Sequence, residues 1–439
     1  MHHKSHAISS SGSDSRVRST LEQVLIKAWW RVVPLLSIVM LLNFLDKVNI
    51  GFASLQMNED LHLSNTVFGI AAGLFAIGYA LAAIPSTILL QRYGARRWIS
   101  LAMVVWGLCS AATALVSRPS ELFLARVALG AAEAGFAPGV IYFLNSWFPS
   151  AYRGRVLGSF LLILPVAIVI GGPLSSLLLS WNGLLGLAGW KWLFLGEGLP
   201  SAVLAVLVFR FLADSPTTAR WLSATEKKTL IDELHVEEKQ IESAKPGVSA
   251  LRTLATPRVL VLALVYHGIA MSGAGALIFL PLVIRSMGFS VRITGLVAAL
   301  PALGAAVSVP LWGRWADRTR RREGVVTTTC FTIAAGLWTT AALLPSPLAV
   351  LPLTVAFVGY FGATAPFWTL PSSFLTGAAA AAAIAAILVV GNLGNFSGPA
   401  LFGWLSDRMH SHAAGLIGSG SIAALAGIGL AAASSGFRR

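Results

Sequence analysis

The stretch Trp29-Trp-Arg-Val-Val-Pro-Leu-Leu-Ser-Ile-Val-Met-Leu-Leu-Asn43-Phe-Leu-Asp46-Lys47-Val-Asn49 carries a carboxylate and an ammonium group side by side in an apolar run that ends near Ala53. In a soluble protein, such a pair is an ordinary surface feature. Inside a bilayer each charge costs about 2.5–3.5 kcal/mol on insertion scales, so it persists mainly where it faces water or a partner within a helix bundle. The pair therefore predicts a polar site inside a membrane-spanning helix.

The composition of the whole chain points to the same class of protein. Its 439 residues are 56% hydrophobic and 11% charged, with a mean hydropathy of +0.75, whereas soluble domains carry about 25% charged residues. The net charge of +14 could suggest a nucleic-acid partner, but the basic residues fall in short clusters between apolar runs, as membrane orientation requires. We expect an all-α integral membrane protein of the lipid bilayer with no nucleic-acid partner.

Apolar runs of about 20 residues mark the expected membrane crossings. We count about twelve of them, at approximately 29–53, 66–90, 98–117, 121–146, 156–180, 192–212, 259–284, 293–313, 325–345, 348–373, 379–404 and 414–435. The expected organisation is a disordered cytoplasmic tail over 1–28, a six-helix bundle over 29–212, a cytoplasmic linker over 213–258 and a second six-helix bundle over 259–439. A regulatory or partner-binding role is the alternative interpretation of the linker.

The loops between the runs predict the orientation of the chain. Basic residues cluster at Arg92–Arg97 and Arg314–Arg322, while the loops of the opposite side hold few. By the positive-inside rule, both termini then lie in the cytoplasm. The register that aligns these two loops also aligns Pro173 with Pro399. A six-span unit repeated in parallel is typical of transporters whose site lies between the two halves.

Four ionisable residues of the first half form the main candidate site. Arg126 and Glu133 are seven residues apart in the fourth run, so they project from one face of a helix. Lys47 and Arg126 are expected at similar depth, where an arginine fork and a compact ammonium group can bind a carboxylate. Asp46 and Glu133 are the candidate proton carriers. The alternative is that Asp46–Lys47 and Arg126–Glu133 only neutralise one another.

Other polar and aromatic residues in the runs are additional candidates for substrate binding. Tyr79 could donate a hydrogen bond to an anion or serve only in helix packing. Trp368 could form an aromatic wall of the substrate site. Asn392 and Asn395, one turn apart, could bind substrate hydroxyl groups or bridge helices.

Two further ionisable residues in the runs are expected to be structural. Glu197 is expected to meet backbone groups freed by Pro200, and His267 to be a hydrogen-bonded packing residue. A proton relay or a ligand contact is the alternative role for His267. Cys109 and Cys330 both fall within runs, which argues against a disulfide framework. The chain shows no nucleophile motif and no His/Cys metal cluster, so we expect neither an enzyme nor a metal cofactor.

The loop after the eighth run carries a different chemistry. Gly313, Asp317, Arg318 and Arg322 place a carboxylate among arginines at a cytoplasmic helix junction. Ion pairs there could break and reform as the two halves rock, so we interpret this loop as a gate and not as a substrate site.

These motifs resemble the major facilitator superfamily and, within it, the anion:cation symporter family. The gate loop matches the pattern Gly-x-x-x-Asp-Arg-x-Gly-x-Arg, with Arg320 in place of the second Gly, whereas Gln91 stands where the first-half copy would have Asp. Further landmarks look like those of the symporter family: Asn43-Phe-Leu-Asp46-Lys47-Val-Asn49, Tyr93-Gly-Ala-Arg-Arg-Trp98, Ala132-Glu133-Ala-Gly-Phe-Ala-Pro-Gly139, Trp147-Phe-Pro149 and Asn392-Leu-Gly-Asn395. The stretch 367–381 is similar to tartrate-type permeases.

The resemblance implies proton-coupled uptake of carboxylates, with the proton as the coupling ion. Asp46 and Glu133 then match the protonation positions and Arg126 the arginine that holds the substrate. Lys47 stands where that family usually has Arg, which keeps the charge but loses the bidentate fork.

We therefore expect a secondary active transporter, a monomer in a bacterial inner membrane, that imports a small organic anion by alternating access. A tartrate-like dicarboxylate or a sugar acid is the expected substrate, and an aromatic acid is the alternative. An efflux antiporter is disfavoured because Gly172-Pro173 is followed by Leu-Ser-Ser-Leu and not by paired glycines. A membrane sensor or enzyme is the third, least favoured reading.

Overall fold

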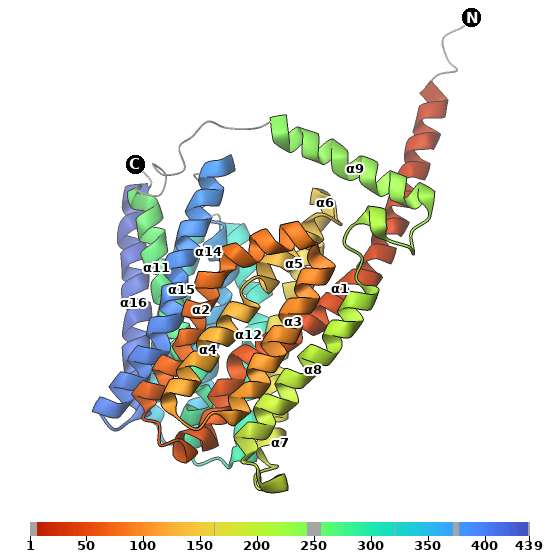
Figure 1. Cartoon of the computed structure of the whole chain (residues 1–439). Coiled ribbons are helices and arrows are strands. Elements are labelled where there is room, and N and C mark those ends of the chain that lie inside the picture. The colour runs from red at the N-terminus through yellow and green to blue at the C-terminus, as the bar shows by residue number, and fades with distance from the viewer. Residues whose placement is uncertain (1–6, 162, 244–255, 320, 372–376, 438–439) are drawn as a thin grey trace, which may run out of the picture.

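Helices form almost all of the computed structural model, which describes residues 7–161, 163–243, 256–319, 321–371 and 377–437 (Figure 1). In chain order the α-helices are α1 (Ala7–Asp60), α2 (Asn65–Tyr93), α3 (Ala95–Ala112), α4 (Pro119–Glu133), α5 (Phe136–Asn145), α6 (Ser150–Leu161), α7 (Ile163–Leu179), α8 (Gly189–Phe211), α9 (Ala224–Ser243), α11 (Pro257–Ser286), α12 (Val291–Thr319), α13 (Arg322–Leu343), α14 (Val350–Trp368), α15 (Gly377–Arg408) and α16 (His412–Phe437). Short 3₁₀ turns lie in the connections, at η1 (Thr113–Leu115), η2 (Leu184–Gly186), η3 (Pro216–Thr218) and η4 (Pro347–Ala349).

The lengths of the helices agree with a chain that crosses a membrane many times. Among the described residues, eleven helical segments are long and apolar enough to do so, and Val166–Leu179 adds a shorter apolar one. The start of α1 and the end of α16 lie at the same end of the bundle as α9 (Figure 1). The expectation of an all-α protein with about twelve apolar helices therefore agrees with the part of the chain that the structure describes.

One expected helix is interrupted. The run 121–146 forms α4 and α5, which are separated by a turn at Ala134–Gly135. At Gly135 the backbone passes so close to α2 that an added Cβ would stand 1.8 Å from Ser86 Oγ. Glu133 is the last residue of α4, so the interruption falls beside a candidate site residue.

The prediction of a disordered tail over 1–28 is wrong for the residues from Ala7 onward, because they belong to α1. Its apolar residues recur at helical spacing on one face, and this face is buried at Leu21, Val24, Leu25 and Ala28. They pack in one cluster with Leu222 and Leu230 of the linker. The tail therefore has an apolar stripe and a surface to cover it, which sequence composition alone did not reveal.

The first part of the linker packs against the first half of the chain. Asp214 follows α8 and accepts a hydrogen bond from the backbone nitrogen of Arg96 at 2.8 Å, at the start of α3. Trp221 stacks on Trp147 with ring centroids 5.5 Å apart, and Arg31 lies over the Trp221 ring at 5.9 Å. The segment between α8 and α9 is thus attached to α1, α3 and the end of α5 through polar and aromatic contacts.

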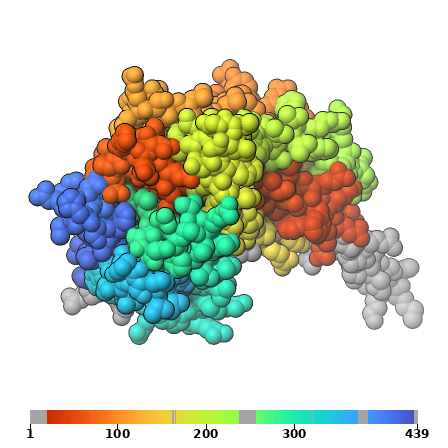
Figure 2. Space-filling view, turned by 90° about the horizontal axis from the view of Figure 1, so that it is seen from below, coloured from red at the N-terminus to blue at the C-terminus, as the bar shows by residue number. Residues whose placement is uncertain are grey.

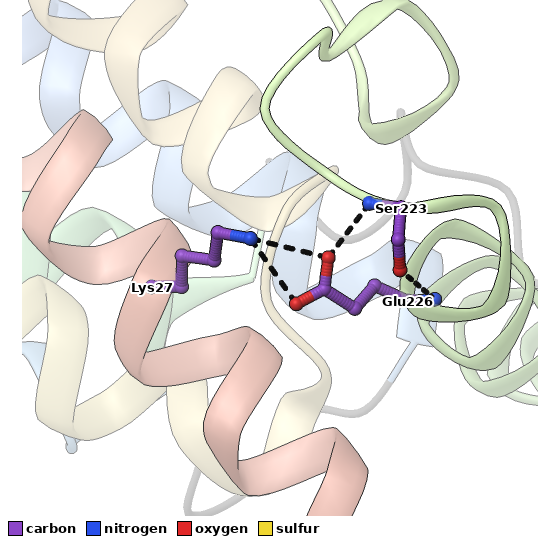
Figure 3. Close-up of polar contacts among 3 residues, drawn as sticks. All are labelled: Lys27, Ser223 and Glu226. Atoms are coloured by element: carbon purple, nitrogen blue, oxygen red, sulfur yellow. Dashed lines mark hydrogen bonds and ion pairs between the residues drawn. The ribbon is translucent and has the colours of Figure 1, made fainter.

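The start of α9 is attached to α1 by an ion pair (Figure 3). Lys27 Nζ lies 3.2 Å from both carboxylate oxygens of Glu226. The Ser223 backbone N–H donates to Glu226 Oε2 at 2.7 Å, and the Glu226 N–H donates to Ser223 Oγ at 3.3 Å, which is a capping box. The pKa of Glu226 is lowered from its ordinary value, first by the Ser223 N–H and also by Lys27, while partial burial opposes the shift.

A double-mutant cycle on Lys27→Met and Glu226→Gln is expected to give a coupling of about 0.2–1 kcal/mol, because both side chains are partly exposed. The depressed pKa of Glu226 means that this contribution is present above the ordinary glutamate pKa and is lost as the pH falls through the lower folded-state value. Unfolding of the detergent-solubilised protein near pH 7 and in acid measures both effects. Lys228→Met, an exposed neighbour, is the control, and equal coupling at both pH values would contradict the assignment.

The two halves meet closely at one end of the bundle. An added Cβ at Gly69 of α2 would stand 2.1 Å from the carbonyl oxygen of Pro399 in α15, and one at Gly403 would stand 2.0 Å from that of Asn65. Gly172 of α7 is equally close to Gly295 of α12. Figure 2 views this end, where the orange turn between α1 and α2 lies beside the blue turn between α15 and α16. Glycine at these positions permits the two helix pairs to touch backbone to backbone.

Candidate functional site

Asn43 links two of the predicted charges. Its amide nitrogen donates to Glu133 Oε2 at 2.8 Å, and its amide oxygen accepts from Lys47 Nζ at 2.9 Å. Lys47 Nζ lies 3.7 Å from the same Glu133 oxygen. Asn43 is four residues before Lys47, hence on the same helix face. Asn43 was not identified from the sequence as a link between Lys47 and Glu133, although its spacing of four residues from Lys47 was the signal available.

Arg126 is buried and incompletely paired. Close contact between α2 and α4, where a Cβ at Gly130 would stand 2.1 Å from the Phe75 carbonyl oxygen, brings the Phe75 ring to 5.1 Å from the guanidinium carbon. The side chain is 1% exposed, yet Nε and Nη1 have no hydrogen-bond partner in the described part of the chain. A buried donor without a partner is costly, so a ligand with acceptor oxygens would stabilise it.

Lys47 approaches the same aromatic group as Arg126. Its Nζ lies 5.8 Å from the Phe75 ring centroid and 5.2 Å from that of Tyr79. The structure thus brings the two predicted cations to one place, with Tyr79 packed on Lys47. Lys47 is 23% exposed at its side chain, whereas Glu133 is fully buried. The cations can therefore receive an anion on the side of Lys47, while Glu133 stays out of water.

The Asp46 carboxylate interacts with residues of α3 and α8, and among the described residues it has no hydrogen bond to Lys47. Its Oδ1 accepts hydrogen bonds from Ser110 Oγ at 2.7 Å and from Asn49 Nδ2 at 3.2 Å. Within the described residues, Lys47 forms its ion pair with Glu133 and not with Asp46. The alternative in which Asp46–Lys47 and Arg126–Glu133 neutralise one another therefore has the wrong partner for Lys47.

Glu197 occupies a place that the sequence did not predict. It was expected to meet backbone groups freed by Pro200, but its Oε1 accepts from Ser175 Oγ of α7 at 2.8 Å, and the carboxylate interacts with Asp46 and Asn49. A Cβ on Gly198 would stand 2.8 Å from Gly107 O of α3, so α3 and α8 touch here. This close approach brings Glu197 into the Asp46 network.

The aromatic residues of the second half form a cluster around Tyr266 of α11. Its ring stacks on Phe367 with centroids 4.9 Å apart and contacts Trp368 edge-on at 4.8 Å. Trp368 was predicted and Tyr266 was not. On α15, Asn395 Nδ2 donates to Asn392 Oδ1 at 3.3 Å, so the two predicted amides bond to each other.

Two further observations concern His267 and possible metal ligands. His267 Nδ1 bonds the Val390 carbonyl at 2.9 Å, as expected of a packing residue. In the described ranges, no group of three or more His, Cys, Asp and Glu side chains is arranged to hold a metal ion.

Comparison with known proteins identifies the family. The profile described as "Major Facilitator Superfamily" matches residues 36–399. This chain belongs to the major facilitator superfamily. It is 41% identical over 404 residues to the "Putative tartrate transporter" of Agrobacterium vitis, covering 92% of this chain and 90% of the relative. It is 38% identical over 388 residues to the "Quinolone resistance transporter" of Acinetobacter baumannii, covering 88% and 89%.

A solved structure supports the same fold. A bacterial homologue of the human lysosomal transporter Spinster superposes with a TM-score of 0.76 at 18% identity, covering 92% of this chain and 96% of that one. The protein is therefore a multi-pass membrane transporter of the superfamily with a small-molecule substrate, and the bacterial sources of its relatives fit an inner-membrane location.

In the described residues, the predicted gate loop makes few of the expected polar contacts. Asp317 and Arg318 are exposed, and the described residues include no ion pair to Asp317. Arg322 Nη1 donates to the Thr369 carbonyl at 3.4 Å, and Gly313 has open space around it. Arg320 and residues 372–376, which belong to motifs used above, lie outside the described residues.

At the opposite end of the bundle, Asp407 connects the two halves of the transporter. It lies near the end of α15 and accepts four hydrogen bonds from the first two residues of α2: Asn65 N at 3.0 Å, Asn65 Nδ2 at 2.8 Å, Thr66 N at 2.7 Å and Thr66 Oγ1 at 2.5 Å. A carboxylate at a helix N-terminus also meets the positive end of the helix dipole. The sequence placed Asp407 just beyond its run, and this contact was missed.

Proposed function

We propose that this chain is a proton-coupled importer of a small organic anion, with a tartrate-like dicarboxylate or a sugar acid as substrate. The observation that carries the proposal is the buried Arg126 guanidinium, whose Nε and Nη1 lack partners in the described residues while Lys47 approaches the same Phe75 ring. A substrate carboxylate would supply the missing acceptors, and Arg126 would hold it through parallel hydrogen bonds.

The proton would be carried by carboxylates that lie next to the two cations. Glu133 is fully buried between Asn43 and Lys47, and its Oε1 has no partner in the part of the chain described. When an anion binds Lys47 and Arg126, it competes with Glu133 for positive charge, which favours protonation of Glu133. Anion binding and proton binding would therefore assist each other, which is the requirement for symport.

Transport would follow alternating access with both termini in the cytoplasm. The closely packed end at Asn65, Gly69 and Asp407 would then face the exterior, and the Gly313–Arg322 loop would lie on the cytoplasmic side. Separation of α2 from α15 at this end would open the site to the exterior.

Uptake into proteoliposomes tests the proposal. Purified protein is reconstituted and offered radiolabelled tartrate, galactonate and benzoate, with an imposed proton gradient and with the gradient collapsed by a protonophore. We expect accumulation of at least one carboxylate only when the gradient is present. Accumulation that survives both gradient collapse and Glu133→Gln would refute proton coupling.

An aromatic acid is the second candidate substrate. The cluster of Tyr266, Phe367 and Trp368 in the second half offers ring faces and edges, and Tyr266 and Trp368 are partly exposed. Benzoate accumulation exceeding that of tartrate would select this candidate. Export of a quinolone from inside-out vesicles, without carboxylate uptake, would instead assign the chain the activity named for its Acinetobacter relative.

Lys47→Arg is expected to change the ratio of the affinities for mono- and dicarboxylates by about tenfold, because the arginine fork adds a second charged hydrogen bond. Competition of unlabelled carboxylates against labelled substrate measures the ranking. Lys191→Arg, in which the parent lysine lies over Trp190, is the control. An unchanged ranking would show that Lys47 does not contact the substrate.

A further inference from the structure

The Asp46 network contains more buried oxygen than its hydrogen bonds use. Asp46 and Glu197 are 0% and 1% exposed, and Asn49 between them is 0% exposed. Three of their oxygens have no partner among the described residues: Asp46 Oδ2, Asn49 Oδ1 and Glu197 Oε2. Two ionised carboxylates in such a place would repel each other with little water to screen them, so the cluster is stable only when it holds positive charge.

The ionisable groups inside the first-half bundle do not balance in charge without an added proton. Three buried acids, Asp46, Glu133 and Glu197, face two bases, Lys47 and Arg126. Lys47 and Arg126 both act on Glu133 and Asp46. The Glu197 carboxylate interacts with the charge of Asp46 and with the hydrogen-bonding side chains of Asn49 and Ser175. In the described part of the chain, no cation is among these groups. The unbalanced negative charge is therefore concentrated at Glu197.

We propose that Glu197 and Asp46 share a second transported proton across Asn49, on the far side of Asp46 from the substrate cations. This inference rests on the proposed function, because it adds a proton to the same transport cycle. An O–H bond forms on one of the two unpartnered carboxylate oxygens as the proton enters, and it breaks when the proton leaves to water on the other side. Asp46 is the only one of the two that also senses Lys47 and Arg126, so it connects the stored proton to the substrate site.

The arrangement explains why two carboxylates are placed at different distances from the substrate cations. Glu133 contacts Lys47 directly and would respond when the anion binds. Among the described residues, Glu197 has no contact with either cation, so it would respond through the charge of Asp46. A dianion brings two negative charges, and two separate proton sites would let the loaded transporter move without stranding charge in the membrane.

The experiment measures how many protons accompany each substrate. In proteoliposomes, the membrane potential at which net substrate flow reverses gives the proton-to-substrate ratio, and Glu197→Gln is expected to lower that ratio by one relative to the unsubstituted protein. Glu121→Gln removes an exposed acid that accepts a hydrogen bond from Ser117 N and serves as the control with unchanged ratio. Ser175→Ala removes the hydroxyl donor but keeps the acid, so it should retain the original ratio.

The possible outcomes separate the two proposals. If the unsubstituted protein moves no carboxylate, the proposed function fails, and the Glu197 proton is then tested by infrared difference spectroscopy on purified protein, where Glu197→Gln should abolish a protonated-carboxyl band. An unchanged reversal potential and an unchanged infrared spectrum in Glu197→Gln overturn the inference and leave a structural residue. Uptake that follows a sodium gradient at fixed pH, and loses this dependence in Glu197→Gln, overturns it in favour of a sodium site.

Discussion

Replacing Arg126 by lysine is expected to weaken substrate binding about 10- to 100-fold, which corresponds to the loss of one charged hydrogen bond of about 1.5–3 kcal/mol. The guanidinium is 1% exposed and lies against the Phe75 ring, while Nε and Nη1 lack partners in the described residues. Lysine keeps the positive charge near Glu133 but cannot form a fork. Arg126→Ala removes the charge as well, so uptake is expected to become undetectable.

Binding of labelled substrate to purified protein measures this effect without transport. Arg92→Lys, at an exposed arginine in the last turn of α2, is the matched control and should bind normally. Thermal unfolding of each variant separates loss of binding from loss of fold. If Arg126→Lys and Arg126→Ala both bind with the original affinity, Arg126 does not belong to the site.

Asp407→Asn is expected to shift the equilibrium away from the state in which α2 and α15 are in contact, by about 10- to 100-fold. Asparagine loses the negative charge and offers one acceptor oxygen where the carboxylate meets four donors from Asn65 and Thr66. Its NH₂ group would also face a backbone N–H. The helices of each half keep their own hydrogen bonds, so we expect the fold to survive.

A pair of spin labels across this end measures the shift. Cysteines at the exposed positions Glu59 and Met409, introduced after Cys109 and Cys330 are replaced, would report a longer distance population in Asp407→Asn. Ser64→Ala is the control, because Ser64 Oγ accepts from Val67 N within the same helix and crosses no boundary between the halves. Identical distance distributions in Asp407→Asn and the unsubstituted protein would show that Asp407 does not hold this end closed.

Much of the fold followed from the lengths of the apolar runs. A run of about 20 apolar residues has few alternatives to a helix in a membrane, because every backbone polar group must be paired within the segment. The same reasoning identified Asp46, Lys47, Arg126 and Glu133 as candidate site residues. A charge inside such a run is costly, so it is found mainly where it has a function or a partner of opposite charge. These predictions depend on local sequence, and the structure contains both the helices and the grouped charges.

Which charge meets which partner could not be predicted in this way. Helix periodicity places Asp46 and Lys47 on different faces of α1, but it does not predict which helices pack against those faces. In the structure, α4 brings Glu133 to Lys47. Helices α3 and α8 bring Ser110 and Glu197 to Asp46. Those contacts depend on close approaches, such as Gly107 against Gly198, where the absence of a side chain lets two helix backbones touch.

Sequence alone determined a helical membrane protein with a charged site in its first half, because the cost of burying polar groups in lipid acts on each segment separately. Tertiary structure decided the rest: the turn after Glu133, the docking of α9 on α1, and the contact of Asp407 with Asn65, which is 342 residues distant in sequence. These features arise from packing between segments far apart in the chain. Their energy depends on distances and orientations that no single run of residues contains.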